Sequence, residues 1–289
     1  MDLIRHLLHD LPDPILQLIR LSLWLALLLL VFVPLERLVA LHGQKLFRPG
    51  FRTDLAYFFI SGMVPRTLLV LPVALLAWLL HFLVPPGLHE AVAGLPIWLR
   101  FALALVVGEL GFYWGHRWSH EIPLLWRFHA VHHSAPKMDW LVNTRAHPVD
   151  LIFTRLCGFI PLYLLGFAQP SRGGAGDVIL LTVILIGTSW GFFIHSNLRW
   201  RLGWLGWLLS TPAFHHWHHT RSDHRDRNYA SMLPVFDRVF GTFYLPRHWP
   251  AEYGTETPVP PDLAGQLIQP LRRRTGSGPG DATPATTPG

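Results

Sequence analysis

Apolar residues in this chain are gathered into long blocks instead of being spread at the spacing of an amphipathic helix. The first block, ILQLIRLSLWLALLLLVFVPL, begins at Ile15, and the blocks lie at about residues 15–34, 54–84, 95–115, 149–169 and 177–195. Blocks of about 20 apolar residues are long enough to cross a bilayer as helices. The pattern therefore predicts an all-α integral membrane protein with four to five membrane segments.

Proline and glycine interrupt this pattern. Pro65 and Pro72 lie inside the second block, which predicts either a kinked helix or two shorter pieces. The stretch AQPSRGGAG separates the fourth and fifth blocks, so these short segments are predicted to form a hairpin. From about Gln269 onward the composition is typical of a disordered tail.

Composition supports a membrane protein. Hydrophobic residues make up 51% of the 289 residues and charged residues only 15%, against about 25% charged residues in soluble domains. The net charge of +6 does not indicate nucleic-acid binding, because the arginines lie beside apolar segments, where cations meet lipid headgroups. The single cysteine, Cys157, excludes an intramolecular disulfide and is predicted to be a small buried side chain.

Loop charge predicts an orientation. The loop after the first block carries Arg37, Lys45, Arg48 and Arg52, whereas the next loop, HFLVPPGLHEAVAGLP, has no lysine or arginine. Because cytoplasmic loops carry the excess of these residues, the first loop is assigned to the cytoplasm. The chain then returns to that side at His116 and again at His195. We expect the histidine clusters to face the cytoplasm, in the inner membrane of a bacterium.

Histidines form the second strong pattern, an H-x-x-x-H box followed by two H-x-x-H-H boxes. Eleven of the 18 histidines lie in this region. They are His116, His120, His129, His132, His133, His147, His195, His215, His216, His218 and His219. On a helix, residues i, i+3 and i+4 share one face, so each box can direct two or three imidazoles toward one point. Surface histidines or a pH sensor are the plainer alternatives, but three boxes on one side of the membrane favour a metal site.

The number of box histidines bears on the metal. Neutral imidazole binds iron, zinc and copper, and eight box histidines exceed the four ligands of one zinc ion. The zinc-protease pattern H-E-x-x-H fails because Arg117 stands at the glutamate position. Eight or nine nitrogens fit two metal ions with open positions, and irons can reduce dioxygen where redox-inert zinc cannot. A membrane zinc hydrolase and a non-catalytic metal-binding protein remain as alternatives.

The order of the boxes around a membrane hairpin resembles a known family. The motifs are GFYWGHRWSHEIPLLWRFHAVHHS, RAHPVD, HSN, TPAFHHWHH and RNYASMLPVFDRVFGTF, which lie between Glu109 and Phe243. This series is similar to the fatty acid hydroxylase superfamily and, within it, to the sterol desaturase branch that includes alkylglycerol monooxygenase. The resemblance implies a membrane-bound non-haem di-iron oxygenase. Such an enzyme uses O2 and two electrons to hydroxylate or desaturate a lipid, such as a sterol, a fatty acyl chain, or an isoprenoid or ether lipid.

The resemblance also implies the ligands of the two irons. They are His116, His120, His129, His132, His133, His215, His218 and His219, together with His195 just after the hairpin. Electrons would come from a separate reductase, cytochrome or ferredoxin-like donor, because the chain has neither a G-x-G-x-x-G nor a C-x-x-C-H motif. The implied catalytic region covers residues 96–250, between N-terminal anchor segments over 1–95 and a disordered tail over 269–289.

Other residues near the boxes have alternative roles. Glu121 follows a box directly and is predicted to be a catalytic carboxylate or a partner of a ligand, with an exposed helix charge as the alternative. His147, before Pro148, could be a ligand, a hydrogen-bond partner of one, or a helix-start residue. His216 should point away from its own box, toward supporting contacts or the surface. The stretch WRLGWLGWLLSTP predicts an interfacial helix before the third box.

Overall fold

The computed structural model describes residues 11–167 and 175–272, and its regular elements are all helices. The described residues form no strand, and isolated bridges pair Ala40 with Leu198 and Thr220 with Tyr253. The predicted all-α class is therefore confirmed. The middle of the predicted hairpin and the tail from residue 273 onward lie outside the described residues. The first residues of that predicted tail form a 3-10 helix, η3 (Gln269–Leu271), and its Pro270 is buried.

Thirteen helical elements follow one another along the described chain. They are α2 (Asp13–Leu38), α3 (Phe51–Leu83), α4 (Pro86–Ala93), α5 (Ile97–Glu121), α6 (Pro123–His133), η1 (Trp140–Thr144), α7 (Pro148–Leu164), α8 (Ala175–His195), η2 (Gly203–Trp207), α9 (Pro212–His218), α10 (Val235–Val239), α11 (Leu263–Ile268) and η3. The prefix η marks a 3-10 helix.

Three of the described helices are long and apolar enough to cross a membrane: α2, α5 and the Val178–His195 part of α8. The fourth predicted segment forms α7, whose 17 residues make it the shorter partner of the predicted hairpin. The second predicted segment forms one 33-residue helix, α3, so the prediction of two separate pieces is wrong. Its prolines lie within a continuous helix, which an apolar setting with neighbouring helices tolerates.

Prolines set the starts of the helices that carry the functional side chains. Pro123, Pro148 and Pro212 stand at the start of α6, α7 and α9, where the missing N–H costs no hydrogen bond. Thr211 caps α9 by accepting a hydrogen bond from the Phe214 N–H at 3.2 Å. A new helix therefore begins a few residues before each of the last two histidine boxes.

Small residues allow α5 and α7 to pack closely. A Cβ at Gly111 would overlap the backbone carbonyl of Cys157, so only glycine permits this approach. Small residues at helix contacts are typical of membrane bundles, where backbones come together without bulky side chains between them. This contact sets the direction of α5, whose last turns carry the first histidine box.

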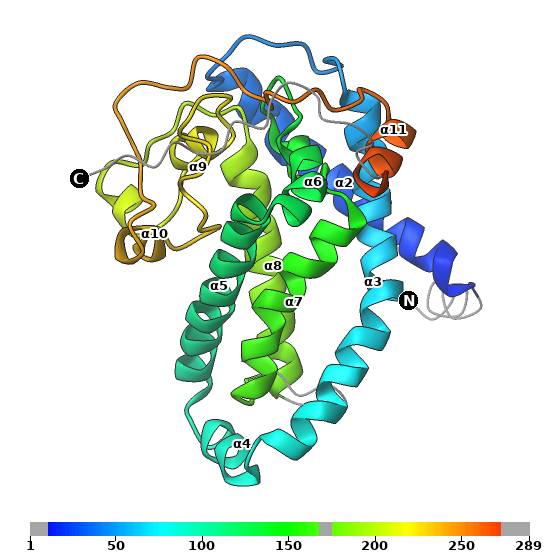
Figure 1. Cartoon of the computed structure of the whole chain (residues 1–289), viewed down its shortest axis with the longest axis vertical. Helices are drawn as coiled ribbons and strands as arrows, with labels where there is room; N and C mark the ends of the chain where they lie inside the picture. The colour runs from blue at the N-terminus through cyan, green and yellow to red at the C-terminus, as the bar shows by residue number, and fades with distance from the viewer. Residues whose placement is uncertain (1–10, 168–174, 273–289) are drawn as a thin grey trace.

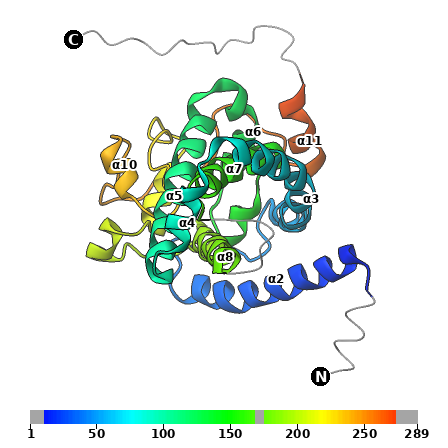
Figure 2. The ribbon, with the colours of Figure 1, turned by 90° about the horizontal axis from the view of Figure 1, so that it is seen from below.

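The helices form a bundle that is closed at one end by a cap. Figure 1 shows α6 and α9 gathered over the ends of α5, α7 and α8, with α4 at the opposite end of the bundle. Seen along the bundle in Figure 2, α2 runs along one edge and α10 lies outside α5. The histidine boxes all lie at the capped end.

Candidate metal centre

All nine histidines that the sequence predicts as ligands come together, from the ends of four helices. His116 and His120 lie in the last turns of α5, and the second box ends α6. The third box ends α9, with His219 as its C-cap, and His195 is the last residue of α8. The side chains form two groups, and all of them are buried.

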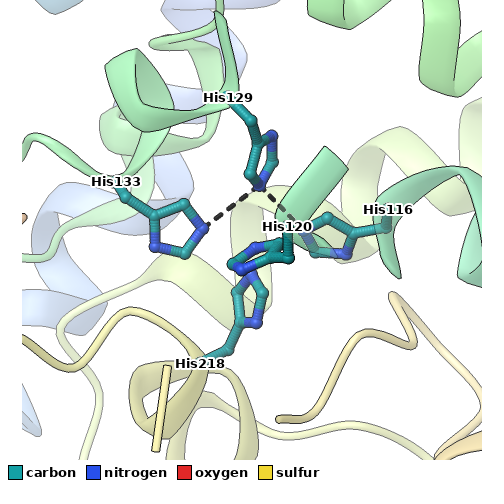
Figure 3. A group of neighbouring side chains, drawn as sticks. All are labelled: His116, His120, His129, His133 and His218. Carbon is teal, nitrogen blue, oxygen red and sulfur yellow. Dashed lines mark hydrogen bonds between the residues drawn. The ribbon is translucent and has the colours of Figure 1, made fainter. Parts of the chain in front are cut away.

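The first group has five members, shown in Figure 3: His116, His120, His129, His133 and His218. Their possible ligand nitrogens all lie within 4.8 Å of one another. Nε2 of His129 is 3.2 Å from Nε2 of His116 and 3.1 Å from Nε2 of His133. In Figure 3 these rings point toward a shared centre from several elements. The arrangement could hold one metal ion.

The second group has four members: His132, His195, His215 and His219. Nε2 of His195 lies 3.1 Å from Nε2 of His132 and 2.9 Å from Nε2 of His215. The two groups adjoin, because the rings of His133 and His219 stack with their centroids 4.4 Å apart. Two ions could therefore be held side by side.

Each H-x-x-H-H box is divided between the two groups. In the second box His129 and His133 belong to the first group and His132 to the second. In the third box His215 and His219 belong to the second group, whereas His218 belongs to the first. Each box therefore directs two imidazoles toward one point, the lower of the two expected numbers, and its third imidazole belongs to the other group. Residues i and i+4 reach one centre, and residue i+3, which is rotated around the helix, reaches the other.

The outer nitrogens of six of these histidines are held by hydrogen bonds. Nδ1 of His129 donates to Asp150 Oδ2 at 3.0 Å, and Nδ1 of His120 donates to Asp226 Oδ1 at 3.0 Å. Four further histidines, His116, His132, His195 and His218, donate to the backbone carbonyls of Tyr229, Arg145, Gly191 and Arg227, respectively. Such partners orient metal-binding imidazoles and fix their tautomer.

These hydrogen bonds determine whether Nε2, the ring nitrogen that faces the centre of each group, carries a proton. A neutral imidazole that donates through Nδ1 has an unprotonated Nε2, which can only accept. His116 and His129 therefore face each other with two lone pairs at 3.2 Å, and His132 and His195 do so at 3.1 Å. Two acceptors at such distances repel unless a cation lies between them. The chemistry of both groups thus fits a metal ion.

Unpartnered nitrogens lead to the same conclusion. Nε2 of His120 and Nε2 of His218 are buried and have no hydrogen-bond partner among the described residues. A buried nitrogen without a partner costs free energy, which a bound metal ion would recover. On His133, His215 and His219 it is Nδ1 that lacks a partner, so the protein does not fix the tautomer of these three rings.

Burial keeps the cap imidazoles neutral. It lowers the pKa of His132 to about 4, with the nearby His129 as the second cause. Burial also lowers the pKa of His133, His218 and His219 well below the ordinary value. At neutral pH these imidazoles are therefore uncharged, which is the form that binds metals.

We expect the metal-free protein to lose stability on acidification. The pKa of His132 is about 4 in the folded chain and about 6.5 in an unfolded one, so the unfolded chain binds more protons between these values. The free energy of unfolding should fall through this window, by about 3 kcal/mol for this histidine alone. Thermal unfolding of chelator-treated protein at pH 7.5, 6 and 5 would show it; an unchanged Tm would contradict it.

A buried ionic network supports the cap behind His132. Arg48 pairs with Asp139 at 2.5 Å and with Asp54 at 2.8 Å, and Arg145 pairs with Asp54 at 2.5 Å. The carbonyl of Arg145 accepts the hydrogen bond from His132. Sequence reasoning missed the two aspartates, because one lies near an apolar block and the other in a loop. An aspartate in the first turn of an apolar helix, a few residues after an arginine, is the signal that could have found the first.

The two other histidines near the boxes belong to neither group. His147 caps α7: its Nδ1 accepts from the Val149 N–H at 3.1 Å, and its Nε2 donates to the Leu267 carbonyl at 3.2 Å. Of the three roles predicted for His147, these contacts correspond to that of a helix-start residue. His216 points away from its box as predicted, but it is buried. Its Nε2 donates to the Ser196 carbonyl, and its Nδ1 accepts from the Tyr253 hydroxyl.

Glu121 lies outside both histidine groups. Its side chain is 45% exposed and pairs with Arg117, four residues earlier, at 2.7 Å. The carboxylates that contact histidines are Asp150 and Asp226. These contacts favour the exposed helix charge over the predicted catalytic role for Glu121, and that role stays a prediction.

Replacing Asp150 with asparagine should weaken metal binding. The carboxylate orients His129 and also accepts from the Ser119 hydroxyl at 3.2 Å, and an amide would remove the negative charge behind the imidazole. Loss of such a partner typically costs 10–100-fold in affinity or activity, so a decrease of about that size is expected. Metal titration of the purified variant would measure it. Glu121→Gln, made in parallel, should have a much smaller effect; an equal loss of metal affinity would support the predicted role of Glu121 as a partner of a ligand.

Comparison with known proteins agrees with this geometry. Residues 101–242 match the family described as fatty acid hydroxylase. Ornithine lipid hydroxylase of Rhizobium tropici is 36% identical over 182 residues, which cover 62% of this chain and 52% of that protein. Alkylglycerol monooxygenase of Danio rerio is 35% identical over a match that covers 54% of this chain and 33% of that protein. The human alkylglycerol monooxygenase is 33% identical over a match that covers 50% of this chain and 31% of that protein.

The chain thus spans about half of the first of these relatives and about a third of the others. No solved structure matches it significantly. The matched region contains every member of both histidine groups, since they lie between His116 and His219. The resemblance seen in the sequence motifs is therefore confirmed, and residues 101–242 of this chain form a fatty acid hydroxylase domain.

Proposed function

We propose that this protein is a membrane-bound oxidoreductase, a non-haem di-iron oxygenase that hydroxylates a C–H bond of a lipid with O2 and two electrons. The observation that carries the proposal is the pair of adjoining histidine groups whose unprotonated Nε2 atoms face each other. The names of the relatives, a lipid hydroxylase and monooxygenases, support the same reaction class. Desaturation would need a second hydrogen to be removed, so hydroxylation is the simpler proposal.

The two groups would each hold one iron. Their five and four imidazoles exceed what one ion requires. When bound, the iron pair would supply the redox chemistry that couples reduction of O2 to oxidation of a C–H bond. Zinc would fit the nitrogens but lacks this chemistry.

The residues of the chain would hold, orient and shield this site. The Nδ1 hydrogen bonds fix the direction of six imidazoles, and burial excludes water from their inner nitrogens. Two of the four contributing helices, α5 and α8, are candidate membrane spans that end in ligand histidines. A lipid could therefore approach the site from the bilayer without leaving an apolar surrounding.

We also propose the extent of the catalytic region, its side of the membrane and the source of its electrons. Residues 96–250 would form the catalytic region, and the family match lies inside it. The lysine and arginine excess of the first loop supports a cytoplasmic position for the cap, in a bacterial inner membrane. Electrons would come from a separate donor protein.

The test compares lipid extracts of cells that produce the wild-type protein or His132→Ala, with iron measured in both purified proteins. We expect a lipid gaining one oxygen atom only with the wild type, together with bound iron. The proposal fails if no lipid differs or if active wild-type protein contains two zinc ions and no iron. The second outcome would instead support a hydrolase.

A further inference from the structure

A small lobe packs against the outer side of α5. We define the α10 lobe as residues 203–209 and 232–243, which contain η2 and α10. In both views it lies outside the helical bundle, beside α5 (Figures 1 and 2). The ring of Tyr113 stacks on Phe240 at 5.2 Å, and Trp114 contacts the same ring at 5.0 Å. Glu109, farther from the capped end of α5, accepts from the Met232 and Leu233 N–H groups.

The length of α5 places this contact below the membrane surface. From Ile97 to Glu109 a helix rises about 18 Å, whereas the hydrocarbon core is about 30 Å thick. An α5 that crosses the bilayer must therefore stay in hydrocarbon for about 12 Å beyond Glu109, to about Arg117. Tilting of the helix would only extend this stretch. The α10 lobe contacts α5 within these residues, so it lies at the depth of the acyl chains.

Backbone N–H groups at the base of the lobe have hydrogen-bond partners within the protein, as a position in the hydrocarbon core requires. Irregular chain in hydrocarbon needs internal partners for its N–H groups, because no water is present to supply them. The Glu109 carboxylate binds two N–H groups of the segment, and Asp237 binds those of Tyr229 and Ala230 at 2.7 and 2.9 Å. Asp237 is itself buried. The carboxylates of Glu109, which is partly buried, and Asp237, which is fully buried, thus take the place of water around residues 229–233 at the base of the lobe.

The outward side chains of the lobe are apolar. Trp204 is 75% exposed and Val239 is 68% exposed, and they are joined by Trp207, Leu208 and Val235. The one cation of the lobe, Arg238, lies over the rings of Trp207 and Phe243 at 4.3 and 4.2 Å and donates to the Trp207 carbonyl. Aromatic faces therefore cover its charge, and its Nε and Nη2 atoms are buried.

We infer that the α10 lobe is inserted into the bilayer leaflet on the histidine side, with Trp204 and Val239 in contact with lipid acyl chains. The protein would then hold its third histidine box from within the membrane, since α9 begins three residues after the η2 part of the lobe ends. Ser210 connects the two parts, with its N–H donating to the Met232 carbonyl at 2.9 Å. The inference depends on α5 crossing the bilayer and is independent of bound metal or activity.

Site-specific labelling tests this placement. In a Cys157→Ala background, which removes the only cysteine, single cysteines replace Val239, Trp204 or Glu252 and carry an environment-sensitive fluorophore. Glu252 is the control, because its side chain is 72% exposed and its carbonyl accepts from the N–H of Arg221, two residues after the third histidine box. The full-length protein is placed in vesicles of phosphatidylethanolamine and phosphatidylglycerol, with lipids that carry a nitroxide on the acyl chain or on the headgroup.

We expect acyl-chain nitroxide to quench the labels at Val239 and Trp204 several-fold more than the label at Glu252. Soluble iodide should show the opposite order. Iodide quenching at Val239 and Trp204 equal to that at Glu252 would overturn the inference. Labels shielded from both iodide and acyl-chain nitroxide would overturn it too, because a second protein copy would then cover the lobe. Two lobe positions are used so that one poorly folded variant does not decide the result.

Discussion

Replacing His129 with alanine is expected to empty the first metal position while the second keeps its ion. His129 is the central member of the first group, with Nε2 close to two other histidines and Nδ1 held by Asp150. Its loss removes the nitrogen around which that group is arranged. Since the loss of an indirect partner already costs 10–100-fold, loss of this direct ligand should lower hydroxylation by more than about 100-fold. The iron content of the proposed two-iron site should fall from two ions per protein to one.

His132→Ala provides the matched comparison, only three residues away on the same helix. Because His132 belongs to the second group, its loss should empty the other position and leave the first occupied. Iron counting and Mössbauer spectra would distinguish the two remaining sites. His147→Ala is the control, since this buried histidine caps α7 outside both groups. Identical spectra for His129→Ala and His132→Ala would contradict the division of the box.

The sequence was sufficient to find the nine histidines but not how they are shared. Box spacing places residues on a helix face, and a family resemblance adds His195. The division between two centres depends on where the ends of α5, α6, α8 and α9 meet, which is set by tertiary packing such as the close contact at Gly111. A local spacing rule carries no information about that meeting point.

The hydrogen-bond partners of the site were harder to predict. Three of the carbonyls that hold imidazoles belong to Tyr229, Arg145 and Arg227, and a carbonyl has no signature in the sequence. Asp150 ends the RAHPVD motif, but nothing local in the sequence distinguishes its carboxylate from that of Glu121, which the structure places on an exposed surface. Asp150 contacts a histidine and Glu121 does not because the fold brings Asp150 next to His129, which lies 21 residues earlier in the chain.

Replacing Asp237 with alanine is expected to weaken both the fold and the first metal position. Its buried carboxylate accepts from the N–H groups of Tyr229 and Ala230 and from the Thr242 hydroxyl at 2.7 Å. Removing it leaves buried donors without an acceptor, at about 1–3 kcal/mol each, so a loss of about 4 kcal/mol in the free energy of unfolding is expected. At a few degrees for each kcal/mol, Tm should fall by about 10 °C.

The effect should reach the metal because the Tyr229 carbonyl, on the same short segment, holds Nδ1 of His116 at 2.7 Å. We therefore expect Asp237→Ala to weaken metal binding at the first group by about 10–100-fold and to change the second group less. Asp223→Ala is the matched control, since this aspartate is exposed in the loop before the same segment and its loss should change stability by less than about 0.5 kcal/mol. Asp237→Ala with a wild-type Tm but depleted iron would show that the carboxylate acts on His116 without supporting the fold. An unchanged Tm and unchanged iron would show instead that water or a neighbouring group replaces it, which would contradict a dry setting for the α10 lobe.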